Sequence, residues 1–90
     1  MININSGKAL EVAGGNTSNG AVVQIWTDNG TTSQQWTIKE NEDGSYTLIN
    51  VNSNKALDIP GGNSDDGTPL QIWTDNGTTS QKWFFISNGN

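Results

Sequence analysis

The chain has 90 residues, which is the length of one small domain, and only 31% of them are hydrophobic. The remainder is rich in Asn, Thr, Ser, Gln and Gly, a mixture typical of β proteins with many turns. The net charge is −5, with four Lys and no Arg, so the sequence excludes nucleic acid as a partner and disfavours an anionic membrane surface.

The chain has no Cys and no His, which excludes disulfides and the common metal sites, and we expect no cofactor and no bound metal. No apolar run is long enough to cross a bilayer, so we expect no membrane insertion. Met1 leads directly into a strand-like segment, so we expect no signal peptide.

An internal repeat with a period of 47 residues dominates the sequence. Eleven consecutive residues, 24–34 (QIWTDNGTTSQ), recur identically at 71–81. Met1 aligns with Leu48, so the first unit begins inside a strand that the second unit starts at about Tyr46. We therefore predict a first unit at residues 1–43, which lacks the start of its first strand, and a second unit at 44–90.

Each unit reads as four short strands separated by turn residues. In the second unit we expect strands at 46–52, 56–59, 70–74 and 82–86. Alternation assigns a core face to Ile2, Ile4, Leu10, Val12, Val23, Ile25, Trp36 and Ile38, and to Ile49, Val51, Leu57, Ile59, Leu70, Ile72, Trp83 and Phe85. The residues between them then point outward: Glu11, Gln24 and Trp26 in the first unit, and Asp58, Gln71 and Trp73 in the second.

Four Gln-x-Trp motifs, each pair about ten residues apart and preceded by Leu-acid-aliphatic, resemble the ricin-type (R-type) lectin domain, also called carbohydrate-binding module family 13. The resemblance covers essentially the whole chain. It implies an all-β fold, the β-trefoil, in which three four-strand units surround a pseudo-threefold axis. It also implies a non-catalytic lectin module with at most one sugar site on the outside of each unit, and most often a galactose- or lactose-type ligand.

By this resemblance Asp58 accepts hydrogen bonds from sugar hydroxyls, Trp73 is the stacking platform, and Gln71 and Gln81 support the site. The corresponding residues of the first unit are Glu11, Gln24, Trp26 and Gln34. Ser33 and Ser80 stand where the family usually has a sugar-contacting Asn, and Glu11 replaces the usual Asp, so we expect the second site to be the better one.

Other roles compete with these. Trp26 and Trp73 can pack under a loop, Asp58 can cap the turn at 60–62, and Gln34 and Gln81 can satisfy backbone groups. Acidic clusters at 40–43 and 65–66 are expected to be solvated surface. An enzyme is not expected, because each unit offers one carboxylate without a second acid placed against it.

Two units do not close a threefold barrel, and open sheet edges favour pairing. Three chains carry six units, enough for two trefoils, so we predict a homotrimer that shares units between barrels. A fragment of a longer chain and a dimer are the alternatives. The near identity of the units also fits an engineered or evolutionary-intermediate trefoil with vestigial sugar sites, and a protein-binding trefoil is the third hypothesis.

Overall fold

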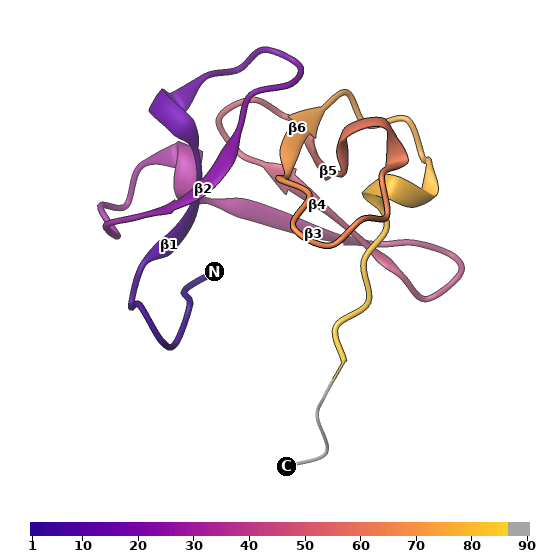
Figure 1. Cartoon of the computed structure of the whole chain (residues 1–90), viewed down its shortest axis with the longest axis horizontal. Coiled ribbons are helices and arrows are strands. Elements are labelled where there is room, and N and C mark those ends of the chain that lie inside the picture. Colours follow the sequence, from indigo (N-terminus) through magenta and orange to yellow (C-terminus); the bar gives the residue numbers. More distant parts are fainter. Residues whose placement is uncertain (87–90) are drawn as a thin grey trace.

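We analysed a computed structural model of the chain, which describes residues 1–86. Short strands and single 3₁₀ turns alternate along the chain (Figure 1). Their order is β1 (Ala9–Val12), η1 (Ala13–Gly15), β2 (Val23–Trp26), η2 (Thr32–Gln34), β3 (Trp36–Glu40), β4 (Tyr46–Asn50), β5 (Ala56–Asp58), η3 (Pro60–Gly62), β6 (Gln71–Trp73) and η4 (Thr79–Gln81). The predicted all-β fold is confirmed, and within residues 1–86 no helix is long or apolar enough to cross a membrane.

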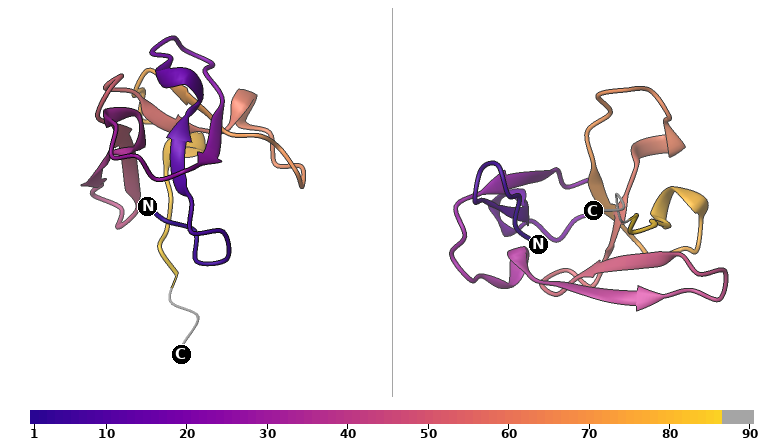
Figure 2. Two further views of the ribbon diagram at one scale, coloured as in Figure 1. Left: turned by 90° about the vertical axis from the view of Figure 1, so that its left-hand side faces the viewer. Right: turned by 90° about the horizontal axis from the view of Figure 1, so that it is seen from below.

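The two units have the same local plan, and one long hairpin joins them. The antiparallel pair β1–β2 in the first unit corresponds to β5–β6 in the second, with Leu10 opposite Ile25 and Leu57 opposite Ile72. Strands β3 and β4 form the hairpin, which runs along one side of the molecule between the units (Figure 2). The predicted boundary between residues 43 and 44 falls in the turn of this hairpin, and the division itself remains a prediction.

Backbone hydrogen bonds tie the first unit to the second. The Gly20 N–H donates to the Ile72 carbonyl at 2.9 Å, and the Ile72 N–H donates to the Ala21 carbonyl at 3.1 Å. The Val23 N–H donates to the Leu70 carbonyl at 3.1 Å. A small apolar cluster of Val12, Ala21 and Ile72 lies at this junction, so part of the core is shared between the units.

The strand ends differ from those predicted. Strands β4, β5 and β6 are each shorter than expected, because a turn begins at residue 51, a 3₁₀ turn occupies 60–62, and residues 74–78 form an irregular loop. The expected strand at 82–86 is absent: within the described residues, Trp83 makes only an isolated bridge with Tyr46, through two backbone hydrogen bonds of 2.8 and 2.9 Å.

The predicted core is only partly right. Val12, Leu57 and Ile72 are buried, and the structure adds Ala9, Ala21, Leu48 and Ala56. Six predicted core residues are instead largely exposed: Ile2, Ile4, Ile25, Ile38, Val51 and Phe85. The other seven are half-buried: Leu10, Val23, Trp36, Ile49, Ile59, Leu70 and Trp83.

In β4 the face predicted to be buried is the wrong one. Leu48 and Asn50 point inward, whereas Ile49 is only half-buried and Val51 is exposed. The buried Asn50 amide donates to the Ser33 carbonyl at 3.0 Å and its oxygen accepts from the Ser53 N–H at 3.3 Å. A polar side chain can occupy a core position when its hydrogen bonds are made, and hydrophobic alternation does not detect this.

Candidate functional site

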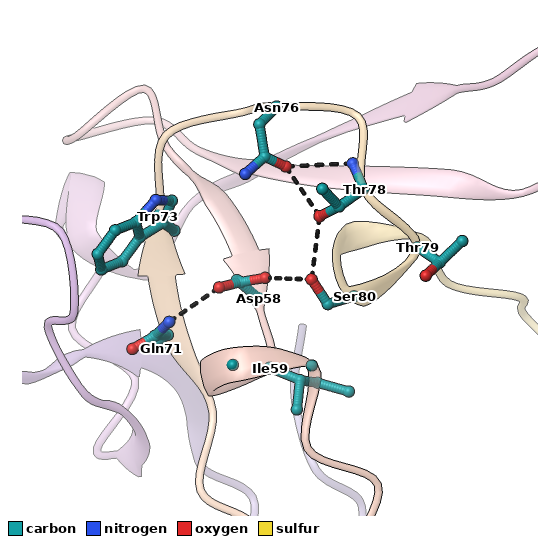
Figure 3. Close-up of a pocket in the computed structure, with 10 residues that line it drawn as sticks. Asp58, Ile59, Gln71, Trp73, Asn76, Thr78, Thr79 and Ser80 are labelled. Atoms are coloured by element: carbon teal, nitrogen blue, oxygen red, sulfur yellow. Dashed lines mark hydrogen bonds between the residues drawn. The ribbon is translucent and has the colours of Figure 1, made fainter.

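Strands β5 and β6 bring Asp58, Gln71 and Trp73 onto one face, as the alternation predicted. Asp58 lies opposite Gln71, and Ala56 lies opposite Trp73, so Gln71 and Trp73 follow one another along the same side of β6. The Gln71 side-chain amide donates to Asp58 Oδ2 at 2.8 Å (Figure 3). The sequence signal and the geometry agree for these three residues.

The Asp58 carboxylate is held on both of its oxygens. Ser80, in η4, donates its hydroxyl to Asp58 Oδ1 at 2.8 Å while Gln71 bonds Oδ2 (Figure 3). Asp58 is therefore buried with its orientation fixed, and each carboxylate oxygen retains further acceptor capacity. Its hydrogen-bond donors are Gln71 and Ser80 rather than backbone groups of the 60–62 turn, so the capping role is not what the structure shows.

An open cavity of about 550 Å³ lies over this carboxylate. Trp73 forms one wall and remains partly exposed, and the loop after β6 forms the opposite wall (Figure 3). The lining residues are Asp58, Ile59, Gly61, Gly62, Gln71, Trp73, Asn76, Thr78, Thr79 and Ser80. The arrangement offers an aromatic surface beside a fixed anionic acceptor.

Asn76 and Thr78 are pocket residues that sequence reasoning did not single out. The Thr78 hydroxyl donates to Asn76 Oδ1 at 2.8 Å and lies 3.0 Å from the Ser80 hydroxyl, so a polar chain runs from the loop to Asp58. Both residues belong to the eleven-residue segment that is identical in the two units. The identity of the two segments indicated that the loop matters. It did not indicate which loop side chains face the cavity, because a loop has no alternation of faces.

Gln81 lies behind the pocket rather than in it. Its side chain is fully buried, donates to the Thr74 carbonyl at 2.9 Å, and accepts from the Asn76 N–H at 3.0 Å. It thereby fixes both ends of the segment that carries Asn76. Gln34 does the same in the first unit, with the Thr27 carbonyl at 2.8 Å and the Asn29 N–H at 2.9 Å.

The first unit does not reproduce the site of the second. Glu11 is buried, and Gln34 donates to its Oε2 at 3.4 Å. Within residues 1–86 neither Gln24 nor Ser33 bonds the Glu11 carboxylate, and the Ser33 hydroxyl instead lies 3.0 Å from that of Thr31. The extra methylene of Glu11 moves its carboxylate away from the positions that Asp58 uses.

A smaller cavity of about 380 Å³ lies near Glu11 and Ser33. Its other lining residues are polar or glycine: Gly14, Gly15, Asn29, Thr31, Thr32 and Asn52. Trp26 and Gln24 do not line it, so the structure brings Glu11 and Ser33 together but leaves the aromatic residue of this unit aside.

Residues from the first unit stand behind the aromatic wall of the second site. The Asn19 side chain accepts from the Thr74 N–H at 3.0 Å, and its amide donates to the Thr74 hydroxyl at 3.1 Å. Gly20 has a φ of +90°, and a Cβ built there would lie 3.9 Å from both the Trp73 ring and Gln71 Oε1. Sequence analysis missed this contact because it joins two units that are far apart in the chain.

Among residues 1–86, no three His, Cys, Asp or Glu residues are grouped as metal ligands would be.

In the β3–β4 turn, hydrogen bonds from the Ser45 hydroxyl and backbone N–H lower the pKa of Asp43 to about 2.

The model of the ricin-type β-trefoil lectin domain-like family matches residues 1–73 and again residues 41–90. The chain belongs to this family. The match covers every residue of the site around Asp58, and family membership supports a non-catalytic, carbohydrate-binding role for this ricin-type chain. No curated protein matches the sequence.

Solved structures place the chain within the β-trefoil fold. A designed threefold-symmetric protein, ThreeFoil, is 34% identical over 99% of this chain, with a TM-score of 0.94. An exo-β-1,3-galactanase from Clostridium thermocellum is 40% identical over 99% of the chain, with a TM-score of 0.93. A mosquitocidal holotoxin is 34% identical over 91%, with a TM-score of 0.79. The chain spans 64% of the designed protein, 19% of the galactanase and 10% of the toxin, so it is a partial trefoil.

Proposed function

We propose that the cavity over Asp58 binds a galactose-type sugar, as a monosaccharide or as the end of an oligosaccharide such as lactose. The observation that carries the proposal is a carboxylate fixed by Gln71 and Ser80 on the same face as the partly exposed Trp73. In this proposal Trp73 stacks on the sugar and Asp58 accepts from its hydroxyls, while Gln71, Ser80 and Gln81 hold the site in shape.

The chemistry of a pyranose matches these groups. One face of the ring presents C–H groups, to which an indole offers dispersion and hydrophobic contact. Its rim presents hydroxyls, and hydrogen bonds from a hydroxyl to an ionised carboxylate are stronger than those between neutral groups. Asn76 and Thr78, on the loop side of the cavity, add polar atoms that donate as well as accept.

Such a site is expected to be weak on its own. An open cavity with one aromatic wall leaves much of the sugar in water, so we expect a Kd of about 0.1–10 mM, or roughly −3 to −5 kcal/mol. Lectins gain avidity by presenting several weak sites together, and a duplicated unit in an oligomer provides that arrangement.

The galactose preference rests on relatedness. The solved structure with 40% identity is named as an exo-β-1,3-galactanase, and this chain matches a part of it that is 19% of its length. Relatedness to part of an enzyme named for a galactose polymer favours a galactose-containing ligand for this chain. The alternative of a trefoil with vestigial sites predicts no sugar binding at all.

We infer a weaker site in the first unit, made of Glu11, Gln24, Trp26 and Ser33 with Gln34 behind the loop. The Glu11 carboxylate lacks the two short bonds that fix Asp58, and its cavity is not lined by Trp26. Bringing the Glu11 carboxylate and the separated Trp26 side chain together at the moment of binding costs free energy, which lowers affinity.

For the assembly, we propose a homotrimer in which three chains share six units between two barrels. Several large apolar side chains that the trefoil would place in its core are exposed in the single chain, among them Ile2, Ile25 and Phe85. Light scattering would give a mass three times that of the 9.6 kDa chain, and a monodisperse monomer would contradict the assembly.

A titration with galactose and lactose, followed by Trp fluorescence, tests sugar binding. We expect a saturable change that falls to the weaker response of the first unit in Trp73→Ala and Asp58→Ala, with Trp36→Phe as a control outside the cavity. Absence of any change at about 50 mM sugar, above the range expected for a weak site, would refute the proposed function.

A further inference from the structure

The second site depends on the unit that precedes it. Segment 19–23 of the first unit makes three backbone hydrogen bonds with residues 70–72: the Gly20 and Val23 N–H groups donate to the Ile72 and Leu70 carbonyls, and the Ala21 carbonyl accepts from the Ile72 N–H. It also supplies the Asn19 side chain to Thr74 and brings Gly20 against the Trp73 ring. The position of Trp73 therefore depends both on β6, which carries it, and on segment 19–23 of the first unit, which packs against it.

The corresponding edge of the first unit is open. Leu10 faces Ile25 in β1–β2 as Leu57 faces Ile72 in β5–β6, so the Ile25 N–H and carbonyl point away from β1. Within residues 1–86 these two groups have no hydrogen bond to another unit. Ile25 is 50% exposed whereas Ile72 is 0% exposed, and Trp26 is 54% exposed against 39% for Trp73.

The second unit carries an unused copy of the segment that would close this edge. In segment 66–70, Asp66 corresponds to Asn19 and Gly67, with a φ of +83°, corresponds to Gly20. Leu70 corresponds to Val23 and supplies the same N–H donor. Pro69 has no N–H. The corresponding Val22 N–H makes no hydrogen bond between the units, so Pro69 does not remove a hydrogen bond from the proposed contact.

Asp66 can make the contacts to Thr27 that matter in the observed junction. Asn19 uses its oxygen to accept from the Thr74 N–H at 3.0 Å and the Thr74 hydroxyl at 3.3 Å, and a carboxylate oxygen accepts both. Thr27 corresponds to Thr74, and within residues 1–86 the Asp66 side chain makes no hydrogen bond. The N–H and hydroxyl donors of Thr27 therefore match the carboxylate acceptors of Asp66.

We propose that segment 66–70 of one chain docks on the outer edge of β2 in another chain, and that its Asp66 and Gly67 complete the binding site around Trp26. The proposal rests on the proposed sugar binding and on association between chains, and it names the surface through which association changes the site around Trp26. The Trp26 site is composite between chains, whereas the Trp73 site of a single chain already has its supporting segment.

Amide hydrogen exchange tests the docking without sugar. The amides of Ile25, Thr27, Gly67 and Leu70 become protected as protein concentration rises, because each becomes a hydrogen-bond donor across the interface. Equal exchange at all concentrations, in a sample whose mass shows association, would place the interface elsewhere and overturn the proposal.

Matched variants test the composite site. Indole N–H resonances of Trp26 and Trp73 report the two sites separately during a lactose titration of the full chain. Asp66→Ala weakens binding at Trp26 by about fivefold, the equivalent of one net hydrogen bond, and leaves Trp73 unchanged. Asp65→Ala, one residue away, leaves both unchanged, and Asp66→Asn retains binding because Asn is the residue found at position 19.

Mixing chains shows whether the contact acts between them. A chain with Asp66→Ala keeps Trp26 but binds about fivefold more weakly there, and a chain with Trp26→Ala keeps Asp66 but has no Trp26 site, so in the mixture the affinity measured at Trp26 returns towards that of the unmodified chain. No recovery in the mixture overturns the composite site. If the Trp73 resonance responds to lactose while Trp26 is indifferent to Asp66, only the composite site fails; if neither indole responds, the proposed function itself fails.

Discussion

Replacing Gln81 with Ala tests whether the buried amides of the repeat hold the pocket loop. Gln81 is fully buried, and its side chain joins the Thr74 carbonyl and the Asn76 N–H, on either side of the turn that forms one wall of the cavity. In Gln81→Ala both backbone groups lose their partners, and the volume of the side chain becomes a cavity beneath the loop. The variant is expected to be less stable and to bind sugar less well.

The magnitude follows from the two lost hydrogen bonds and the lost packing. Each bond contributes about 1 kcal/mol net, and truncation of a buried side chain of this size adds about 1–2 kcal/mol. We expect a total loss of about 3 kcal/mol in the free energy of unfolding. With a urea dependence of about 1–1.5 kcal/mol per molar for a small domain, the midpoint falls by about 2 M.

Urea unfolding followed by Trp fluorescence measures this loss, at one fixed protein concentration because association also affects stability. Gln35→Ala is the control, since the Gln35 amide donates to the Gly30 carbonyl at an exposed position. We expect the control to change stability by less than about 0.5 kcal/mol. A loss below about 1 kcal/mol in Gln81→Ala would show that the loop is held by other contacts.

Three further predictions concern the site, its support and an exposed turn. Asp58→Asn replaces an acceptor with an amide whose NH₂ group faces the donors Gln71 or Ser80, so sugar binding weakens at least tenfold by titration calorimetry. Asn19→Ala removes the bonds to Thr74 and broadens the Trp73 indole resonance, with a loss of about 1 kcal/mol in urea unfolding. The pKa of Asp43, about 2 in the folded chain, rises in Ser45→Ala when followed by NMR. Because the folded pKa is depressed, this carboxylate contributes stability at neutral pH that is lost as pH falls from about 4 towards 2.

The fold class and the face of the site could be predicted from the sequence because both depend on periodicity. A repeat of 47 residues and the Gln-x-Trp spacing indicated a trefoil, and alternation along 71–73 placed Gln71 and Trp73 together with Asp58. Short strands obey period two well when their two faces differ strongly in polarity.

The core was harder to predict, for two physical reasons. Ile49 and Val51 made one face of β4 look apolar, but the buried face holds Leu48 and a hydrogen-bonded Asn50. Alternation predicts that Ile25 and Ile72 are both core residues, yet the burial of Ile72 comes from the neighbouring unit, and Ile25 lacks such a neighbour in a single chain.

The roles of the Gln residues that recur in both units could be predicted only in part from the sequence. Gln34 and Gln81 occur in the same motif as Gln24 and Gln71, but they turn to the backbone while Gln71 turns to Asp58. The residue type gives the hydrogen-bonding capacity, whereas the partner depends on a loop conformation that one sequence does not specify.

The most direct test of the central claim is to observe magnetisation transfer between a bound sugar and the indole of Trp73. In a sample of lactose with the 90-residue chain, nuclear Overhauser effects from the C–H protons of the galactose ring to the Trp73 indole protons are predicted, and they disappear in Asp58→Ala. Saturable binding without any such effect at Trp73, or with effects only to other aromatic residues such as Phe84, would contradict the assignment of the site.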